Sequence, residues 1–162
     1  MAQTNVYLKL TDVDGESLDA DHEKWIEVHG WSWGVDNQAD FAIGQGGQST
    51  QSHIAPITIT KHIDAASMVL FQKCTQGGHI PEGTLELMKL DGDSRITYMK
   101  IHLEDVMVKG IHPGGAGSDT VGMETVSLVF ARFHGAYKTQ EDSGSAGGGK
   151  EFGWDIQKSK TA

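Results

Sequence analysis

The chain has 162 residues, 38% of them hydrophobic, which suffices for the core of one domain spanning residues 1–162. Acidic residues outnumber basic residues by 22 to 13, and the formal charge of −9 disfavours nucleic acid and anionic lipid as partners. The amino terminus lacks the pattern of a secretory signal, and no apolar run reaches the roughly 20 residues that cross a bilayer. We therefore expect a soluble protein that folds in the cytoplasm, with no membrane insertion.

The amino-terminal part shows the alternation that is typical of strands. Val6, Leu8 and Leu10 predict a first strand buried on one side. An acidic loop follows, and the tryptophans and aliphatic residues between positions 25 and 33 predict a second strand region. Because the chain has 21 glycines and only 3 prolines, these runs favour strands joined by glycine turns and a mainly β fold.

The segment Asp36–Ser52 is rich in glycine, glutamine and serine and contains little that could be buried. It predicts a long protruding loop with Gly44, Gly46 and Gly47 at its centre. Loops of this length are uncommon inside a compact domain and are usually functional. We interpret the segment as a contact arm.

One substantial helix is expected in the middle of the chain. Ser67 is its candidate N-cap, and the glycines at 77 and 78 supply the stop. One helical face would carry the apolar side chains of Leu70, Phe71 and Cys74. As the single cysteine, Cys74 has no internal disulfide partner and is expected in the core.

Further strands are expected wherever apolar residues alternate with polar ones. The predicted strand positions are Ile57–Thr60, Leu85–Leu87, Met99–Leu103, Val126–Phe130 and a last short strand at Gly153–Ile156. Asp91-Gly92 and Pro113-Gly114-Gly115 predict turns. The segment from Tyr137 to Gly149 is polar and rich in glycine, and we expect it to be irregular.

Metal-binding patterns are absent or imperfect. Asp12, Asp14, Glu16 and Glu23 imitate a calcium-binding ladder, but Ser17 stands where such a loop needs glycine, so a solvated hairpin loop is the preferred interpretation. None of the eight histidines occurs in an HxH or HExxH spacing. The sequence therefore predicts no metal site.

Sequence motifs of catalytic and phosphate-binding sites are also incomplete. Asp142-Ser143-Gly144 resembles a nucleophile motif but lies in the polar tail, where a triad could not be held. Gly44–Thr50 lacks the lysine of a phosphate-binding loop. We expect no catalytic residue, no cofactor and no enzymatic activity.

Several motifs resemble, in identity and spacing, the haemolysin-coregulated protein (Hcp) family. The matching residues are Asp12-Val13, Gly15-Glu16-Ser17, Asp19, His22, Ile26, Val28, Trp31-Ser32-Trp33-Gly34, Thr60-Lys61, Ile63-Asp64, Cys74, Gly77, His79, Tyr98, Ile101, Leu103, Val106, Val108 and Gly153-Trp154-Asp155-Ile156. The resemblance covers essentially the whole chain. Departures lie mainly in Asp36–Ser52 and Gln140–Lys150.

The resemblance implies a mainly β fold in which two antiparallel sheets form a β-barrel with one α-helix, as in phage tail tube proteins. It also implies a structural subunit of the type VI secretion inner tube, assembled as homo-hexameric rings that stack. The implied partners are stacked rings of the same chain, a spike protein at the tube tip, a contractile sheath and effector proteins in the lumen. Such a subunit leaves the cell through the type VI system without a cleaved signal peptide.

Two segments suit this assembly. Thr125–Phe133 is apolar on both faces, as expected of a strand that covers the core on one side and a neighbouring subunit on the other. Ser32 alternates with Trp31 and Trp33, and we hypothesise that it faces the lumen and contacts cargo. Since Ile26 and Val28 share its parity, this placement requires a bulge near His29-Gly30. The arm around Gly44, Gly46 and Gly47 would reach the next ring.

Two alternatives remain open from the residues alone. A small β-barrel hydrolase or lyase predicts a deep pocket lined by histidine and carboxylate. A soluble ligand-binding barrel predicts a monomer with an enclosed apolar cavity. The oligomeric state distinguishes both from a ring subunit.

Overall fold

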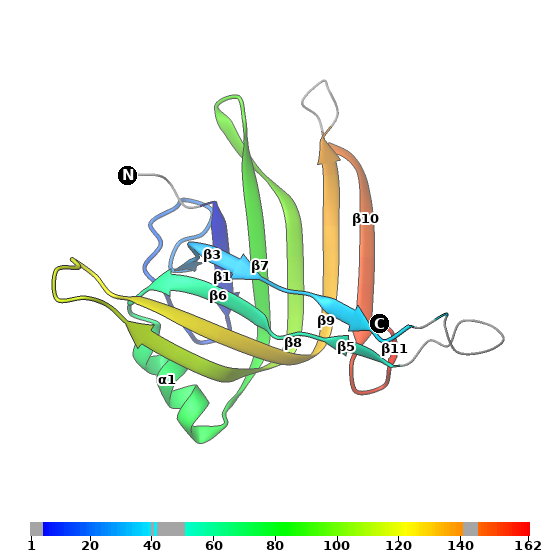
Figure 1. The fold of residues 1–162 in the computed structure, drawn as a ribbon. Helices are drawn as coiled ribbons and strands as arrows, with labels where there is room; N and C mark the ends of the chain where they lie inside the picture. Colours follow the sequence, from blue (N-terminus) through cyan, green and yellow to red (C-terminus); the bar gives the residue numbers. More distant parts are fainter. Residues whose placement is uncertain (1–4, 40, 42–50, 141–145) are drawn as a thin grey trace.

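The computed structural model describes residues 5–39, 41, 51–140 and 146–162, and Figure 1 shows its ribbon. The described residues form strands and one helix, which follow one another in this order: β1 (Val6–Leu10), β2 (Ile26–Glu27), β3 (Gly30–Ser32), β4 (Val35–Asn37), β5 (Ser52–Ile54), β6 (Ile57–His62), α1 (Ser67–Gln76), β7 (His79–Asp91), β8 (Ser94–Gly114), β9 (Met123–Gln140), β10 (Ala146–Asp155) and β11 (Lys160–Thr161).

The larger sheet has the order β11-β10-β9-β8-β7-β1-β2, and β6 joins it by pairing with β9 and β3. Strand β9 pairs with β10 over residues 132–140 and with β6 over residues 123–128. The long strands β8 and β9 therefore pass through two layers, and Figure 1 shows them curving from one layer to the other. A separate two-stranded sheet pairs β4 with β5.

The mainly β class, with two antiparallel sheets and one helix among the described residues, confirms the sequence prediction. The hydrogen-bonded order of the larger sheet does not close on itself within these residues, so the barrel is open between β2 and β3. At this opening β2 pairs with β1, whereas β3 pairs with β6. The backbone of Val28 still bonds to β1 and that of His29 already bonds to β6, so the chain changes its partner strand between them. A bulge was predicted near His29-Gly30, and the structure has this change of partner beside that position instead.

Strand β8 keeps one face on the core in spite of its bend. Its buried residues are Ile101, Leu103, Val106, Val108 and Ile111, so the period of two is broken twice. Asp105 adopts a positive φ of 53° at the first break, and the register with β9 shifts between Val108 and Gly110 at the second. Such irregularities bend a strand while returning its apolar side chains to the same side.

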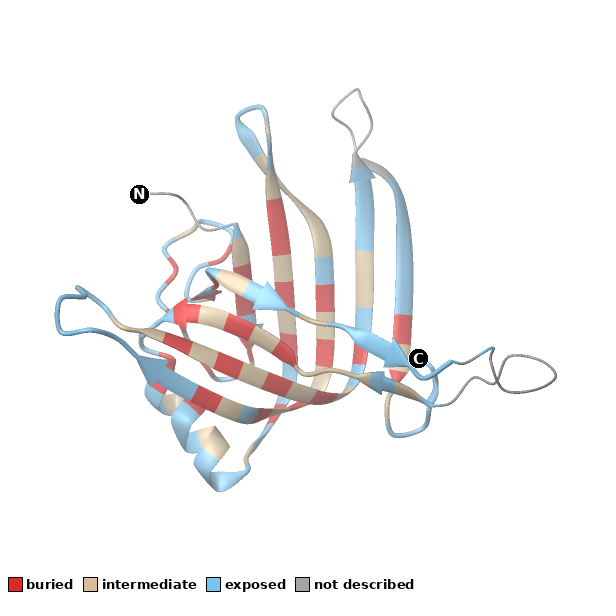
Figure 2. Cartoon of the chain, viewed as in Figure 1, coloured by how far each residue is buried: buried red, intermediate tan, exposed pale blue. Residues whose placement is uncertain are grey.

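The core lies between the two layers, and Figure 2 shows buried residues alternating along β6, β8 and β9. Its buried members come mainly from β1, β2, β6, β7, β8, β9 and α1, and they include Leu8, Leu10, Ile26, Ile57, Ile59, Leu70, Ile80, Leu85, Leu87, Val126, Leu128 and Phe130. On β9, Val126 and Leu128 fill one face, while Val129 and Ala131 on the other are only half-buried. The expected second apolar face of Thr125–Phe133 is thus present, except that Phe133 also joins the core.

Helix α1 is anchored by a buried ion pair. Nζ of Lys61 on β6 contacts the Glu124 carboxylate on β9 and lies 2.8 Å from Oδ1 of Asp64. The hydroxyl of Ser67 donates to Oε1 of Glu124 at 2.7 Å. The prediction that Ser67 caps the helix is wrong, because the N-cap is Ala66 and Ser67 satisfies this buried pair instead.

The C-terminal end of α1 lies where the sequence predicted it. Gly77 forms the C-cap with a left-handed φ of 64°, which confirms the predicted stop. Leu70 is fully buried and Cys74 packs against the core from a half-buried position. Phe71 is exposed, so its predicted place on the buried face is wrong.

Strand pairing extends further than side-chain patterns indicated. The ends of the expected loop Asp36–Ser52 belong to β4 and β5, while Gly44, Gly46 and Gly47 lie outside the described residues. The expected irregular tail after Tyr137 is wrong, because β9 continues to Gln140 and β10 begins at Ala146. Strands pair through backbone hydrogen bonds, which do not depend on the side chains. A glycine-rich hairpin can therefore form without the apolar alternation that marks a strand in the sequence.

The two predicted turns differ in outcome. The turn predicted at Asp91-Gly92 is present between β7 and β8: Asp91 pairs with Ser94, and Gly92, at a φ of 58°, and Asp93 connect them. Pro113 and Gly114 still pair with β9, opposite Glu124 and Met123, so this connection turns later than predicted.

Candidate assembly surfaces

Among the described residues no group of three or more histidine, cysteine, aspartate or glutamate side chains is placed to hold a metal ion. None of the helical segments in the same residues is long and apolar enough to cross a membrane. The exposed features that stand out are apolar surfaces and the edges of the sheets.

An open groove, which we call the aromatic groove, lies between the β4–β5 sheet and the β9–β10 hairpin. It has a volume of about 350 Å³ and is lined chiefly by Trp33, Val35, Ile54, Phe133, Tyr137 and Phe152. Phe152 pairs in register with Gly135, which adds no side chain to the floor of the groove. The groove is thus an apolar depression whose walls come from two separate sheets.

Aromatic contacts hold the inner wall of the groove in place. The Trp33 ring meets the Phe133 ring edge to face at a centroid distance of 4.8 Å, and Phe133 lies 5.9 Å from Phe152. Nε1 of Trp33 donates to the carbonyl of Ala55 at 3.0 Å, which ties the residues before β4 to those after β5. A fixed wall of rings can receive an apolar side chain without reorganising.

The outer rim of the groove is open to solvent. Val35 is 61% exposed, Phe152 55% and Tyr137 42%. Single exposed apolar residues are ordinary, but three that surround one apolar depression indicate a contact surface. The sequence prediction missed this surface because it treated the tail as irregular. Phe152 and Trp154 alternate with Glu151, Gly153 and Asp155, which was a signal for strand β10 although not for the groove itself.

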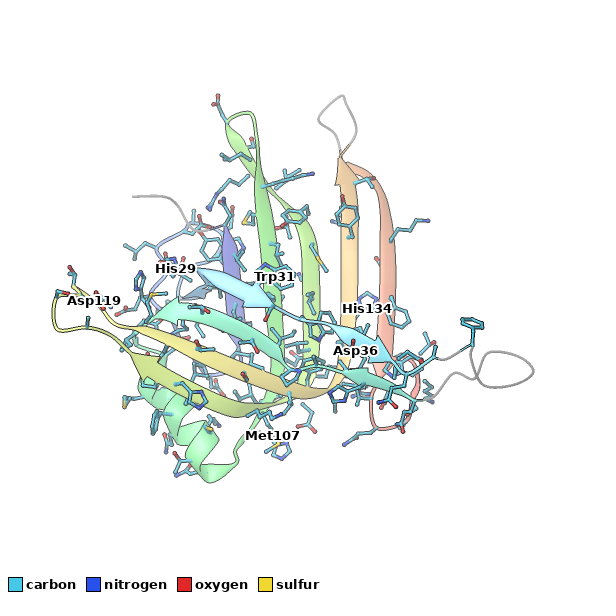
Figure 3. The ribbon with its side chains drawn as sticks, in the orientation of Figure 1. His29, Trp31, Asp36, Met107, Asp119 and His134 are labelled. Carbon is cyan, nitrogen blue, oxygen red and sulfur yellow. The ribbon has the colours of Figure 1, made fainter. Side chains whose placement is uncertain are left out.

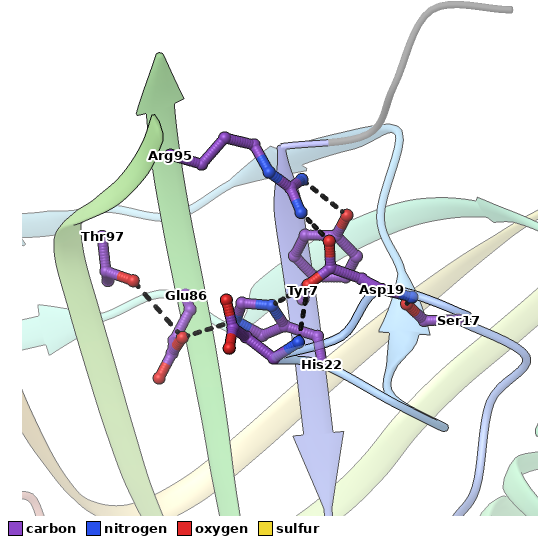
Figure 4. Close-up of polar contacts among 8 residues, drawn as sticks. Tyr7, Ser17, Asp19, His22, Glu86, Arg95 and Thr97 are labelled. Atoms are coloured by element: carbon purple, nitrogen blue, oxygen red, sulfur yellow. Dashed lines mark hydrogen bonds and ion pairs between the residues drawn. The ribbon is translucent and has the colours of Figure 1, made fainter. Parts of the chain in front are cut away.

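At the other end of the larger sheet, the acidic loop between β1 and β2 is held by a polar cluster (Figure 4). The His22 ring is buried, with Nδ1 2.8 Å from Asp19 and Nε2 2.7 Å from Glu86 on β7. It stacks on the Tyr7 ring at 4.4 Å. Arg95 on β8 contacts the Asp19 carboxylate and donates to the Tyr7 hydroxyl at 3.0 Å.

The segment is a hairpin loop, as expected, because β1 and β2 pair antiparallel on either side of it and Asp12, Asp14, Glu16 and Glu23 are exposed. It is nevertheless more firmly held than expected. Ser17 and His22 are buried, and the loop is tied to β7 and β8 by charged contacts. Both ring nitrogens of His22 lie within hydrogen-bond distance of a carboxylate, so the ring is held from both sides. His22 therefore has a structural role that positions the loop.

The predicted lumen residue Ser32 is exposed at the end of β3, opposite Thr58 of β6. Trp31, labelled in Figure 3, is more exposed than expected, whereas Trp33 is half-buried in the groove wall. The two tryptophans do not share one buried face. Strand β3 pairs only with β6 among the described residues, so its other edge is open to a neighbour.

Two histidines lie together where the chain passes from β2 to β3. The rings of His29 and His62 meet edge to face at 4.4 Å, in a depression that Glu16, Glu27 and Asp119 also line. Partial burial and the neighbouring His62 lower the pKa of His29 below its ordinary value of 6.5, and Glu27 opposes this shift. A lowered pKa favours the neutral ring at neutral pH.

Comparisons with known proteins agree with this architecture. The sequence profile of the family described as "Type VI secretion system effector, Hcp" matches residues 7–137. Protein hcp1 of Pseudomonas aeruginosa is 32% identical over 159 residues, which cover 98% of each chain. The chain therefore belongs to the Hcp family of the type VI secretion system, which confirms the resemblance seen in the sequence.

Solved structures give the same result for the fold. A structure described as that of a type six secretion system protein superposes with a TM-score of 0.91 at 31% identity, covering 99% of this chain and all of the other. Hcp1 from Salmonella typhimurium superposes with a TM-score of 0.80 at 29% identity, covering 97% of both chains. These similarities extend over both layers of the fold.

Proposed function

We propose that this chain is a structural subunit of the type VI secretion inner tube, that its residues 1–162 form one domain, and that six copies close into a ring. The proposal rests on membership of the Hcp family and on one observation, the exposed aromatic groove. A soluble monomer gains nothing from an apolar depression with an exposed apolar rim. A ring gives that surface, and the open edge of β3, a neighbour to cover them.

In this proposal the rings stack into a tube whose lumen holds effector proteins. Ser32, exposed on β3, is the candidate lumen residue that contacts cargo. Gly44, Gly46 and Gly47 remain the candidate stacking arm between β4 and β5. The tube would carry a spike protein at its tip, lie within a contractile sheath, and leave the cell by the type VI route without a cleaved signal peptide.

The alternatives have less support. A hydrolase or lyase needs a pocket in which a nucleophile, a base and an oxyanion site converge. The described residues offer instead a histidine pair in an open depression and a buried His22 whose two nitrogens already face carboxylates. A ligand-binding barrel needs an enclosed cavity, whereas the aromatic groove is open along its rim. We propose that the chain has no catalytic activity.

The proposal is tested by size-exclusion chromatography with light scattering on the whole chain. A ring subunit gives a mass six times the 17.5 kDa of one chain. A stable monomer across ionic strengths and protein concentrations would contradict it. Reproducible hydrolysis that a single histidine substitution abolishes would favour the enzyme instead.

A further inference from the structure

Leu18, in the loop between β1 and β2, is the most exposed large apolar residue of the described chain, at 93%. Its neighbours point the other way, since Ser17 is buried and the Asp19 carboxylate binds His22 and Arg95. Leu18 is therefore an apolar side chain held outward by a loop whose other groups are engaged.

The backbone around Leu18 is fixed as well. The amide of Gly15 donates to the carbonyl of Lys24 at 2.7 Å, and the amide of Lys24 donates to the carbonyl of Ser17 at 2.9 Å. The amide of Ser17 donates to Trp25 at 3.1 Å. Because the loop is already ordered, docking Leu18 on a partner would lose little conformational entropy.

The loop and the aromatic groove lie at opposite ends of the molecule. The groove is built on β9 and β10, towards one end of the hydrogen-bonded order, and the loop connects β1 to β2 at the other end. Figure 1 shows the same separation, with β10 on one side of the ribbon and β1 on the other. An apolar projection at one end and an apolar depression at the other are the two halves of a head-to-tail contact.

The charges of the two ends are complementary. Around Leu18 the exposed acidic residues are Asp12, Asp14, Glu16, Asp21 and Glu23, with Lys24 as the exposed basic residue. In residues 131–140 and 146–162 the exposed basic residues are Arg132, Lys138, Lys150, Lys158 and Lys160, with Glu151 as the exposed acidic residue. An acidic end that met another acidic end would be repelled, so the charges favour head-to-tail association over face-to-face association.

We propose that Leu18 of one copy docks in the aromatic groove of the next copy, with the acidic loop facing the lysines of β9–β11. This inference rests on the proposed ring and assigns its contact surface. Each copy contributes one loop and one groove, so the ring closes when the loop of the last copy reaches the groove of the first copy.

The first test compares two leucine substitutions in the whole chain by light scattering. Leu18→Asp should remove the ring species at protein concentrations where the wild-type chain is fully assembled. Leu90→Asp is the matched control, because Leu90 is also exposed but belongs to β7 and is part of neither the loop nor the groove lining. Circular dichroism of each variant checks that the fold is retained.

The second test mixes two disabled chains. Leu18→Asp keeps an intact groove, and Phe152→Asp keeps an intact loop. Each alone should be monomeric, but their mixture should form a one-to-one dimer and stop there, since only one productive contact can form. A contact in which both partners use the same surface could not produce this result.

A third variant tests the charges. Glu16→Lys with Asp21→Lys should weaken the ring, and adding Lys138→Glu with Lys150→Glu to the same chain should restore it. A ring that survives Leu18→Asp as well as it survives Leu90→Asp would overturn the docking contact and leave the proposed function standing. A wild-type chain that never assembles would overturn both.

Discussion

Lys61 and Glu124 face each other across β6 and β9 as register partners, and their charged groups meet where both side chains are fully buried. Nζ of Lys61 also donates to the carbonyl of His62 at 2.9 Å, and the Ser67 hydroxyl binds Glu124. The pair thereby joins both strands to the first turn of α1. Buried ion pairs are retained only when such additional hydrogen bonds compensate their desolvation.

Removing one member of this pair should be costly. Lys61→Met leaves the buried Glu124 carboxylate without its cation, and we expect a loss of about 3–5 kcal/mol in the free energy of unfolding. The double variant Lys61→Met with Glu124→Leu should be clearly more stable than the single one, because no uncompensated charge remains. Urea denaturation measures both. A single variant that costs no more than the double would show that the pair is not the anchor.

The His22 cluster predicts a second effect on stability. His22→Phe keeps an aromatic ring stacked on Tyr7 but removes the ring nitrogens that contact the Asp19 and Glu86 carboxylates, at a cost of about 1.5–3 kcal/mol. His79→Phe is the control, since His79 contacts Asp105 at 2.6 Å on the exposed surface, where such pairs contribute about 0–1 kcal/mol. Equal losses in thermal unfolding would contradict a structural role for His22.

Close packing under the same loop predicts a glycine requirement. A Cβ at Gly15 would lie 2.5 Å from the carbonyl oxygen of Trp25 and 2.7 Å from Cα of Ile26. Gly15→Ala must displace backbone, and we expect it to lower the free energy of unfolding by about 1–3 kcal/mol. Gly34→Ala should be near neutral, because a Cβ there meets nothing within 4 Å. A harmless Gly15→Ala would mean that the loop shifts freely.

The pH dependence of stability should reflect His29. Partial burial and the neighbouring His62 lower its pKa in the folded chain, although Glu27 opposes this, so the unfolded chain binds the proton more readily. The stability that neutral His29 contributes is complete above the ordinary pKa of 6.5 and is lost as pH falls below it. Between pH 8 and pH 5 the wild-type chain should lose more unfolding free energy than His29→Asn. An equal or smaller loss would contradict the assignment.

The fold could be predicted where the pattern of residue types indicates which face of an element is buried or where an element ends. The strand at Val6–Leu10 and the helix stop at Gly77 followed from alternation and from glycine at a left-handed position. The β9–β10 hairpin could not be predicted in the same way, because backbone pairing there runs through glycines and lysines. Along β8, the irregularity at Asp105 changes the parity of buried residues, and a pattern with a fixed period of two cannot follow it.

The aromatic groove and the exposed Leu18 were harder to predict from the sequence than the fold was. The family resemblance led to the expectation of a ring, but the groove joins Trp33 to Phe152 across more than a hundred positions of the chain. Leu18 stands out only once Ser17 and His22 are known to be buried. Contact surfaces of this kind depend on tertiary placement, and no local pattern encodes them.

The most direct test of the central claim is negative-stain electron microscopy of the purified whole chain. A subunit of the type VI tube should give ring-shaped class averages with six-fold symmetry and a central opening, and side views of stacked rings at high protein concentration. Images that contain only particles of monomer size, under conditions in which the chain is folded, would contradict the proposed function.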